Sequence, residues 1–223
     1  MEDVKELQKE RQRSRKKFLK FFPQAFKDPK YQAWERNYKW NAHVEWEKEL
    51  NKERYEQLLK EERYNEIAMA AVKLETRTNL LFSFEKMALR DAVKDPAGAK
   101  AFAMGLYDYV YGEGPLKERF ETFAKVLASL PRRQTRVLTW PLQTVFGFIA
   151  NPKEHIFLKP RVTQMAADRY HFNFQYRSKP NWETYQNLLG FAKTIKKEMA
   201  DLKPKDFIDL QSFIWVMGSS EYD

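Results

Sequence analysis

The sequence predicts a mainly α-helical fold, a compact multi-helix domain with room for a small β element around residues 155–177. Apolar residues recur at helical spacing along most of the 223-residue chain. Only 7 glycines are present, which is few for an all-β sandwich or a glycine-rich nucleotide fold. A chain of this length can bury roughly 70% of its unfolded surface, and its 43% hydrophobic content is sufficient to form that core.

The charge pattern and the prolines suggest how the chain is divided. Residues 1–22 are expected to form a basic N-terminal helix or arm, and residues 23–223 a single helical domain. A subdivision of that domain near residue 96 or near residue 131 stays open. Each of these two positions adjoins a proline, which ends a helix because the preceding residue is pushed out of the α region.

Most of the expected helices have proline, glycine or a capping residue at their ends. The segment 31–59 is expected to form one or two long helices, and residues 65–94 one strong central helix that Asp95-Pro96 ends. The remaining helices are expected at residues 97–111, 115–130, 141–150, 162–170, 181–202 and 206–217. The last of these is apolar nearly all round and should be buried. Alternating apolar and polar residues in His171–Arg177 are typical of a short strand.

The net charge of +9 is distributed unevenly. Residues 131–180 carry 9 basic and 2 acidic groups, a net +7, and residues 1–20 carry a further +4. Residues 21–130 are neutral and residues 181–223 carry −2. Basic groups interleaved with aromatic residues favour a polyanion that has exposed bases. In the alternative interpretation, the aromatic residues belong to the core and the cations form a solvated rim.

A turn between two expected helices holds the best phosphate-binding cluster, Arg132, Arg133 and Arg136, just before Trp140-Pro141. Guanidinium groups bind phosphate bidentately, and the N-terminus of the following helix would add its dipole. The alternative is a structural role in capping helix ends or in pairing with the Glu-rich segment 45–66. The full candidate set is Arg132, Arg133, Arg136, Lys159, Arg161, Arg177 and Lys179.

One pair of residues allows an enzymatic hypothesis. Arg36 and His43 resemble the short R-x4-6-H motif of HEPN-type ribonucleases, and seven residues place them about 20° apart on a helix. The resemblance implies that they act on a scissile phosphate, one in proton transfer and one in charge stabilisation. A solvated polar helix face explains the same pattern. No zinc-protease, phosphate-loop or serine-hydrolase motif is present.

Neither a metal nor a cofactor is expected. His43 and Glu47 lie one helical turn apart, but two ligands fall short of the three that catalytic zinc sites use. The chain contains no cysteine, which excludes thiolate zinc sites and disulfides. Asp206 and Asp209 stand at the start of the last helix, where N-terminal capping is a better interpretation than an acid pair.

Several long stretches together resemble a family of uncharacterised bacterial proteins of about this length. They are LLFSFEKMALRDAV, YGEGPLKERF, LPRRQTRVLTWPL, HIFLKPRVTQMAA, PNWETY and DFIDLQSFIWV. The resemblance implies a bacterial, cytoplasmic protein with one integrated fold, and it brings no activity. A cytoplasmic location without a membrane partner is also expected because no signal peptide or long apolar span is found.

Three functional hypotheses follow. The first is a non-enzymatic, nucleic-acid-associated protein that binds the phosphate backbone of DNA or RNA through residues 131–179 and the basic N-terminal segment. The second is an HEPN-like, metal-independent ribonuclease that uses Arg36 and His43. The third is an interaction or scaffold protein whose aromatic surface binds a protein partner.

Overall fold

The computed structural model describes residues 2–133 and 135–223, with side chains from residue 6 onward. These residues form helices and no strand, which confirms the mainly α prediction. The helices are α1 Glu2–Phe21, α2 Pro29–Tyr31, the π-helical turn Gln32–Arg36, α3 Asn37–Glu49, α4 Lys52–Lys60, α5 Tyr64–Thr76, α6 Ser83–Ala92, α7 Pro96–Tyr111, α8 Leu116–Ser129, α9 Trp140–Ala150, α10 Pro160–Arg169, α11 Trp182–Glu198 and α12 Phe207–Gly218.

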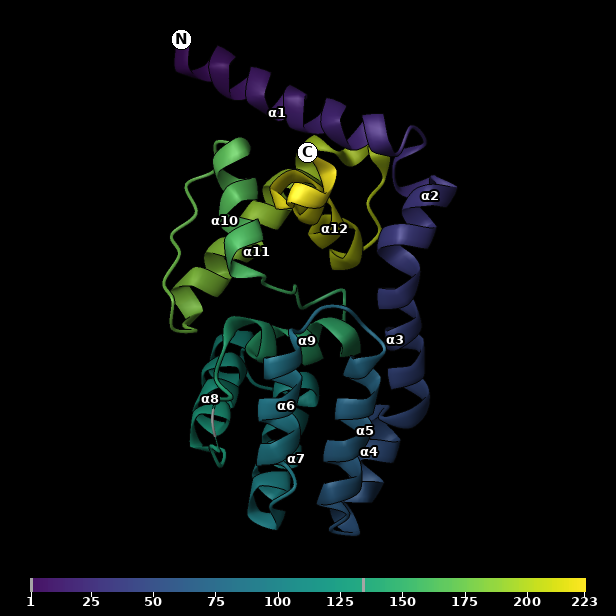
Figure 1. Cartoon of the computed structure of the whole chain (residues 1–223), viewed down its shortest axis with the longest axis vertical. Coiled ribbons are helices and arrows are strands. Elements are labelled where there is room, and N and C mark those ends of the chain that lie inside the picture. Colours follow the sequence, from purple (N-terminus) through teal and green to yellow (C-terminus); the bar gives the residue numbers. More distant parts are fainter. Residues whose placement is uncertain (1, 134) are drawn as a thin grey trace.

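The helices form two tiers (Figure 1). Helices α4 to α8 stand side by side in the lower tier, and α1, α10, α11 and α12 make the upper tier, while α3 runs along one side. Helix α9 lies crosswise between the tiers and packs on α3, α5, α7 and α8. All its residues from Trp140 to Ala150 are buried. One hydrophobic cluster extends from Phe18 in α1 to Tyr222 near the C-terminus.

Helix α12 is the second buried helix, as its apolar sequence predicts. It packs on α10, α1 and α11, and only Phe207 and Trp215 among its residues are partly exposed. Asp206 caps its N-terminus, because the carboxylate Oδ1 accepts hydrogen bonds from the backbone N–H groups of Ile208 at 3.0 Å and Asp209 at 3.3 Å. The predicted capping role of Asp206 is therefore confirmed. Within the described ranges, no helix is both long and apolar enough to cross a bilayer.

The prediction of a single helix over residues 65–94 is wrong, because the segment forms two helices: α5 ends at Thr76 and α6 begins at Ser83. The Thr78 hydroxyl donates to the carbonyl of Glu75 at 2.8 Å, so a side chain takes over an acceptor at the end of α5. Lys86 then donates to the Thr78 carbonyl at 3.0 Å, which holds the break in place. Polar side chains that compete for backbone groups outweigh the apolar pattern in this segment.

The small β element expected around residues 155–177 is also absent from the described chain, since this range contains α10 and extended segments. The predicted alternation is real, because Phe172, Phe174 and Tyr176 are half-buried between exposed neighbours. The partners are side chains of α11 rather than a second strand. Asn187 Oδ1 accepts from Gln175 N at 2.9 Å. The hydroxyl of Thr184 accepts from Arg177 N at 3.2 Å and donates to the Gln175 carbonyl at 2.9 Å.

His155 is completely buried beneath α9, and only a glycine leaves room for it. A Cβ at Gly147 would lie 2.7 Å from His155 Cγ. Neither ring nitrogen has a hydrogen-bond partner in the described part of the chain, although Nε2 lies 3.3 Å from Glu154 Oε2. Burial lowers the pKa of His155 from its ordinary value of 6.5, against the opposing effect of the Glu154 carboxylate. Burial therefore favours the neutral form of this imidazole in the folded protein.

We expect His155 to make the protein acid-sensitive. Well above pH 6.5 both states carry a neutral ring. As the pH falls through 6.5, the unfolded chain takes up the proton before the folded protein does, so stability falls with the pH. This group contributes at most about 1.4 kcal/mol per pH unit. Urea unfolding of His155→Phe from about pH 7 to about pH 5 should show a weaker pH dependence than the wild type. The exposed His171, changed to Asn, is the control, and an equal pH dependence in His155→Phe would contradict the assignment.

Candidate nucleic-acid interface

The turn between α8 and α9 presents its arginines to solvent. Arg132, Arg133 and Arg136 are all exposed, whereas Val137 and Trp140 are buried and anchor the turn to the core. Pro131 follows the end of α8, and Thr139 caps α9 by accepting from Leu142 N at 3.3 Å. The predicted arrangement of an arginine turn before a helix N-terminus is therefore present.

A second basic segment, distant in sequence, lies against this turn. The indole Nε1 of Trp140 donates to the carbonyl of Arg177 at 2.8 Å, and the rings of Trp140 and Tyr176 are 6.5 Å apart. Burial raises the pKa of Tyr176, and the positive charge of Arg136 offsets part of that rise. The fold thus brings the turn and the segment that carries Arg177 and Lys179 together, although about 40 residues separate them in the sequence.

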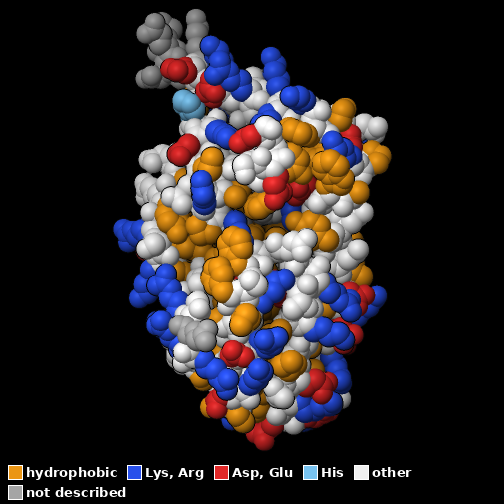
Figure 2. Space-filling model, viewed as in Figure 1, with side chains coloured by type: hydrophobic (Ala, Val, Ile, Leu, Met, Phe, Trp, Pro, Cys, Tyr) orange, Lys and Arg blue, Asp and Glu red, His pale blue; other side chains and the backbone are white. Residues whose placement is uncertain are grey.

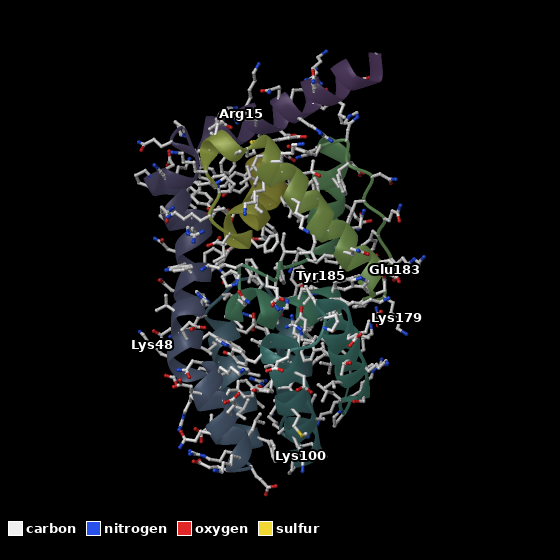
Figure 3. The ribbon with its side chains drawn as sticks, turned by 180° about the vertical axis from the view of Figure 1, so that it is seen from behind. Arg15, Lys48, Lys100, Lys179, Glu183 and Tyr185 are labelled. Carbon is white, nitrogen blue, oxygen red and sulfur yellow. The ribbon has the colours of Figure 1, made fainter. Side chains whose placement is uncertain are left out.

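We call the exposed cations of these two adjoining segments the arginine face: Arg132, Arg133, Arg136, Arg177 and Lys179. All five side chains are exposed. Among the described residues, no acidic group lies within ion-pair distance of Arg133, Arg136, Arg177 or Lys179. Figure 2 shows Lys and Arg side chains grouped along the left flank of the molecule. In Figure 3, seen from behind, Lys179 stands at the outer edge with Glu183 next to it, and Tyr185 lies further in.

Helix α6 adds a cation that the sequence reasoning missed. The pKa of Asp91 is lowered mainly by a hydrogen bond from Lys94, and the charges of Arg133 and Arg90 lower it further. Arg133 therefore lies near the end of α6, and the exposed Arg90 is close by. The net charge of residues 21–130 is zero, so the charge distribution along the sequence gives no sign that Arg90 contributes to a basic surface.

Two predicted residues lie elsewhere. The ammonium group of Lys159 donates to the Leu80 carbonyl at 2.9 Å and sits 3.4 Å from the ring centroid of Phe82. Burial lowers the pKa of Lys159, which is half-buried. Arg161 is exposed in the first turn of α10, and no contact in the described residues joins it to the arginine face. The fold therefore gathers five of the seven predicted phosphate-binding residues.

The basic N-terminal segment is a helix that packs on α10 and α12, and acidic groups pair with several of its cations. Arg15 Nη1 lies 2.8 Å from Asp201 Oδ1, and Lys17 Nζ lies 2.9 Å from Asp223 Oδ1. Arg11 forms an ion pair with Glu198. The acidic residues of the C-terminal segment thus compensate part of the charge of α1.

Arg36 and His43 do share a helix face, with Trp40 between them, but each has a structural partner. Arg36 is only 5% exposed. Its guanidinium Nη1 lies 2.7 Å from Asp209 Oδ1, and its Nη2 lies 2.7 Å from Asp206 Oδ2. His43 Nδ1 lies 2.9 Å from the Ile149 carbonyl.

A hydrolytic site in this region would require a guanidinium group that can reach a phosphate, and Arg36 is enclosed by carboxylates. Tyr31 also donates to Asp209 Oδ1 at 2.6 Å, which completes a buried polar network between the π-helical turn and α12. In the described parts of the chain, no three His, Cys, Asp or Glu residues gather as metal ligands would. His43 and Glu47 therefore have no third ligand beside them.

Four cations of the arginine face therefore have no ion-pair partner among the described residues, whereas two buried carboxylates bind the guanidinium group of Arg36. Comparison with protein-family models, with curated proteins and with solved structures finds no match for this chain, so the functional argument rests on the geometry of these residues.

Proposed function

We propose that this protein binds the phosphate backbone of a nucleic acid through the arginine face, without catalysing a reaction on it. The observation that carries the proposal is the convergence of two basic segments into one exposed surface with no acidic partner for most of its cations. Guanidinium groups in this state are available to phosphate oxygens. Unpaired surface cations also attract a polyanion whose condensed counterions are released on binding.

The state of Arg36 favours binding over the ribonuclease alternative. Its guanidinium group forms hydrogen bonds with two buried carboxylates, so a scissile phosphate would have to displace them. Among the described residues, no carboxylate forms such a pair with Arg133 or Arg136. The ribonuclease hypothesis retains a direct test in His43→Ala, because His43 is partly exposed and its loss leaves the carboxylate network intact.

Neutralising the arginine face should weaken binding and its salt dependence together. We expect the triple variant Arg133→Gln/Arg136→Gln/Arg177→Gln to bind labelled RNA or DNA more weakly at low salt than the wild type. Between about 50 and 200 mM salt, the slope of log K against log salt should flatten by roughly two units, since each lost phosphate contact removes about 0.7–0.9. Fluorescence anisotropy of the oligonucleotide measures both quantities.

A matched control removes the same charge from other helices. Lys27, Lys60 and Lys73 are exposed lysines outside the arginine face, and their triple change to Gln gives the same net charge. The control should retain most of the affinity and the salt slope of the wild type. Equal losses in both triple variants would show that bulk charge drives the binding, and an arginine variant that binds like the wild type would contradict the proposal.

A further inference from the structure

Two phenylalanines at the start of α6 form an exposed aromatic platform. Phe82 and Phe84 are 54% and 50% exposed. Their rings are stacked, with centroids 5.5 Å apart and planes inclined by 17°. Phe84 makes no other ring contact in the described residues, so a face of its ring is open to solvent. Large aromatic side chains are usually buried, and an exposed stacked pair calls for an explanation in binding.

The platform is held rigidly and is connected to the arginine turn. Lys159 covers a face of the Phe82 ring from 3.4 Å. The carboxylate of Glu85, which is only 3% exposed, accepts from Phe82 N at 3.0 Å and from the hydroxyl of Thr139 at 2.9 Å. Thr139 caps α9 at the end of the arginine turn. One buried carboxylate therefore joins the platform to the segment that carries Arg132, Arg133 and Arg136.

Helix α6 spans the distance between the platform and the cations. The helix begins at the platform, and its other end carries Arg90 and Asp91. Arg133 lies near this end, because its charge lowers the pKa of Asp91. Ten residues of helix extend about 15 Å, a length that several nucleotides of a strand can span. In the view of Figure 2, apolar side chains gather near the middle of the molecule, and Lys and Arg side chains lie beside and below them.

We infer that the nucleic acid is single-stranded, with a base stacked on the Phe82–Phe84 platform and the adjacent phosphates on the arginine face. This inference rests on the proposed function and names its substrate class. Bases of a duplex are stacked on one another and offer no free face, whereas bases of a single strand can stack on exposed aromatic rings. The bordering cations favour this polyanion over an apolar protein segment, which would gain nothing from them.

The test uses Phe84→Leu, which retains an apolar side chain of similar size and removes the ring. The probes are a single-stranded thymidine oligonucleotide, a duplex of the same length and an abasic strand that has the backbone without bases. The wild type should bind the single strand more tightly than either of the other probes. Phe84→Leu should lose about 5- to 150-fold in affinity for the single strand, the range for one stacked base, and keep the salt slope of the wild type. Because Phe84 is half exposed, thermal melting should be almost unchanged and serves as the folding control.

The outcomes separate the two proposals. Equal affinity for single strand, duplex and abasic strand overturns the platform, and so does a Phe84→Leu protein that binds like the wild type. In both cases a weakened Arg133→Gln/Arg136→Gln/Arg177→Gln variant would leave backbone binding standing. Stronger binding of the duplex would point to shape recognition by the arginine face alone and also overturns the platform. Should the arginine variant bind normally, the proposed function itself fails.

Discussion

Replacing Arg36 with methionine is expected to lower the free energy of unfolding by about 3–5 kcal/mol, because it leaves buried carboxylates without their counterion. The side chains of Asp206 and Asp209 are 6% and 0% exposed. Burial disfavours the charge of Arg36, yet the hydrogen bond to Asp206 and the charge of Asp209 raise the pKa of Arg36 above its usual value. In a chain of 223 residues, this loss corresponds to a fall in Tm of roughly 6–20 °C.

An exposed ion pair provides the control for this variant. Arg54 Nη2 lies 3.4 Å from Glu66 Oε1, and both side chains are more than a third exposed. Such pairs contribute less than about 1 kcal/mol, so Arg54→Met should melt close to the wild type. Similar melting of Arg36→Met and Arg54→Met would contradict the structural role assigned to Arg36. The same destabilisation means that lost activity in an Arg36 variant could not identify a catalytic residue, whereas His43→Ala can.

Gly218→Ala should destabilise the protein by about 3 kcal/mol, the upper part of the usual range for overpacking. Gly218 ends α12 where that helix crosses α10, and these two helices form the most extensive helix contact in the described fold. A Cβ at this position would lie 2.0 Å from the carbonyl oxygen of Val162 and 2.8 Å from its carbonyl carbon. Both atoms belong to the backbone of α10, so the two helices would have to separate.

The same chemical change at Gly190 should have the opposite sign. Gly190 lies in the middle of α11, and an added Cβ would meet nothing within 4 Å. Alanine there removes the backbone entropy cost of glycine in a helix and should stabilise the protein by about 0.5–1 kcal/mol. Urea unfolding of both variants measures the difference. Destabilisation by Gly190→Ala, or a neutral Gly218→Ala, would show that the close approach of α12 to α10 is not what requires Gly218.

The helix boundaries were the most predictable part of the fold, since short-range chemistry governs them. Asp95 and Pro96 separate α6 from α7, with the Asp95 carboxylate accepting from Gly98 N at 2.9 Å. Pro141 and Pro160 occupy the first turns of α9 and α10. Proline supplies a suitable φ angle and lacks an N–H that the first turn could not use. Burial of α12 was predictable for a similar reason, because a helix that is apolar on all sides has no face for water.

The candidate site was predictable only in part. The charge tally located the arginine turn, and hydrogen bonding of Trp140 to the carbonyl of Arg177 then brought the second basic segment beside it. Lys159 belongs to a basic stretch of the sequence, yet its ammonium group lies over the Phe82 ring. The exposure of Phe82 and Phe84 was not predictable from the sequence, because the apolar pattern of this segment predicts a continuous buried helix.

The sequence was sufficient for the fold class, for most helix ends and for the location of the excess positive charge, because these depend on composition and on residues within a few positions of one another. Only the tertiary structure determines which charged side chains form ion pairs with one another. Arg36 meets Asp206, 170 residues away, and Arg15 meets Asp201, 186 residues away. Coulomb interactions and burial depend on distance in space, which the order of residues along the chain does not reveal. The same reason explains why several N-terminal cations pair with C-terminal carboxylates, while Arg133, Arg136, Arg177 and Lys179 have no acidic partner among the described residues.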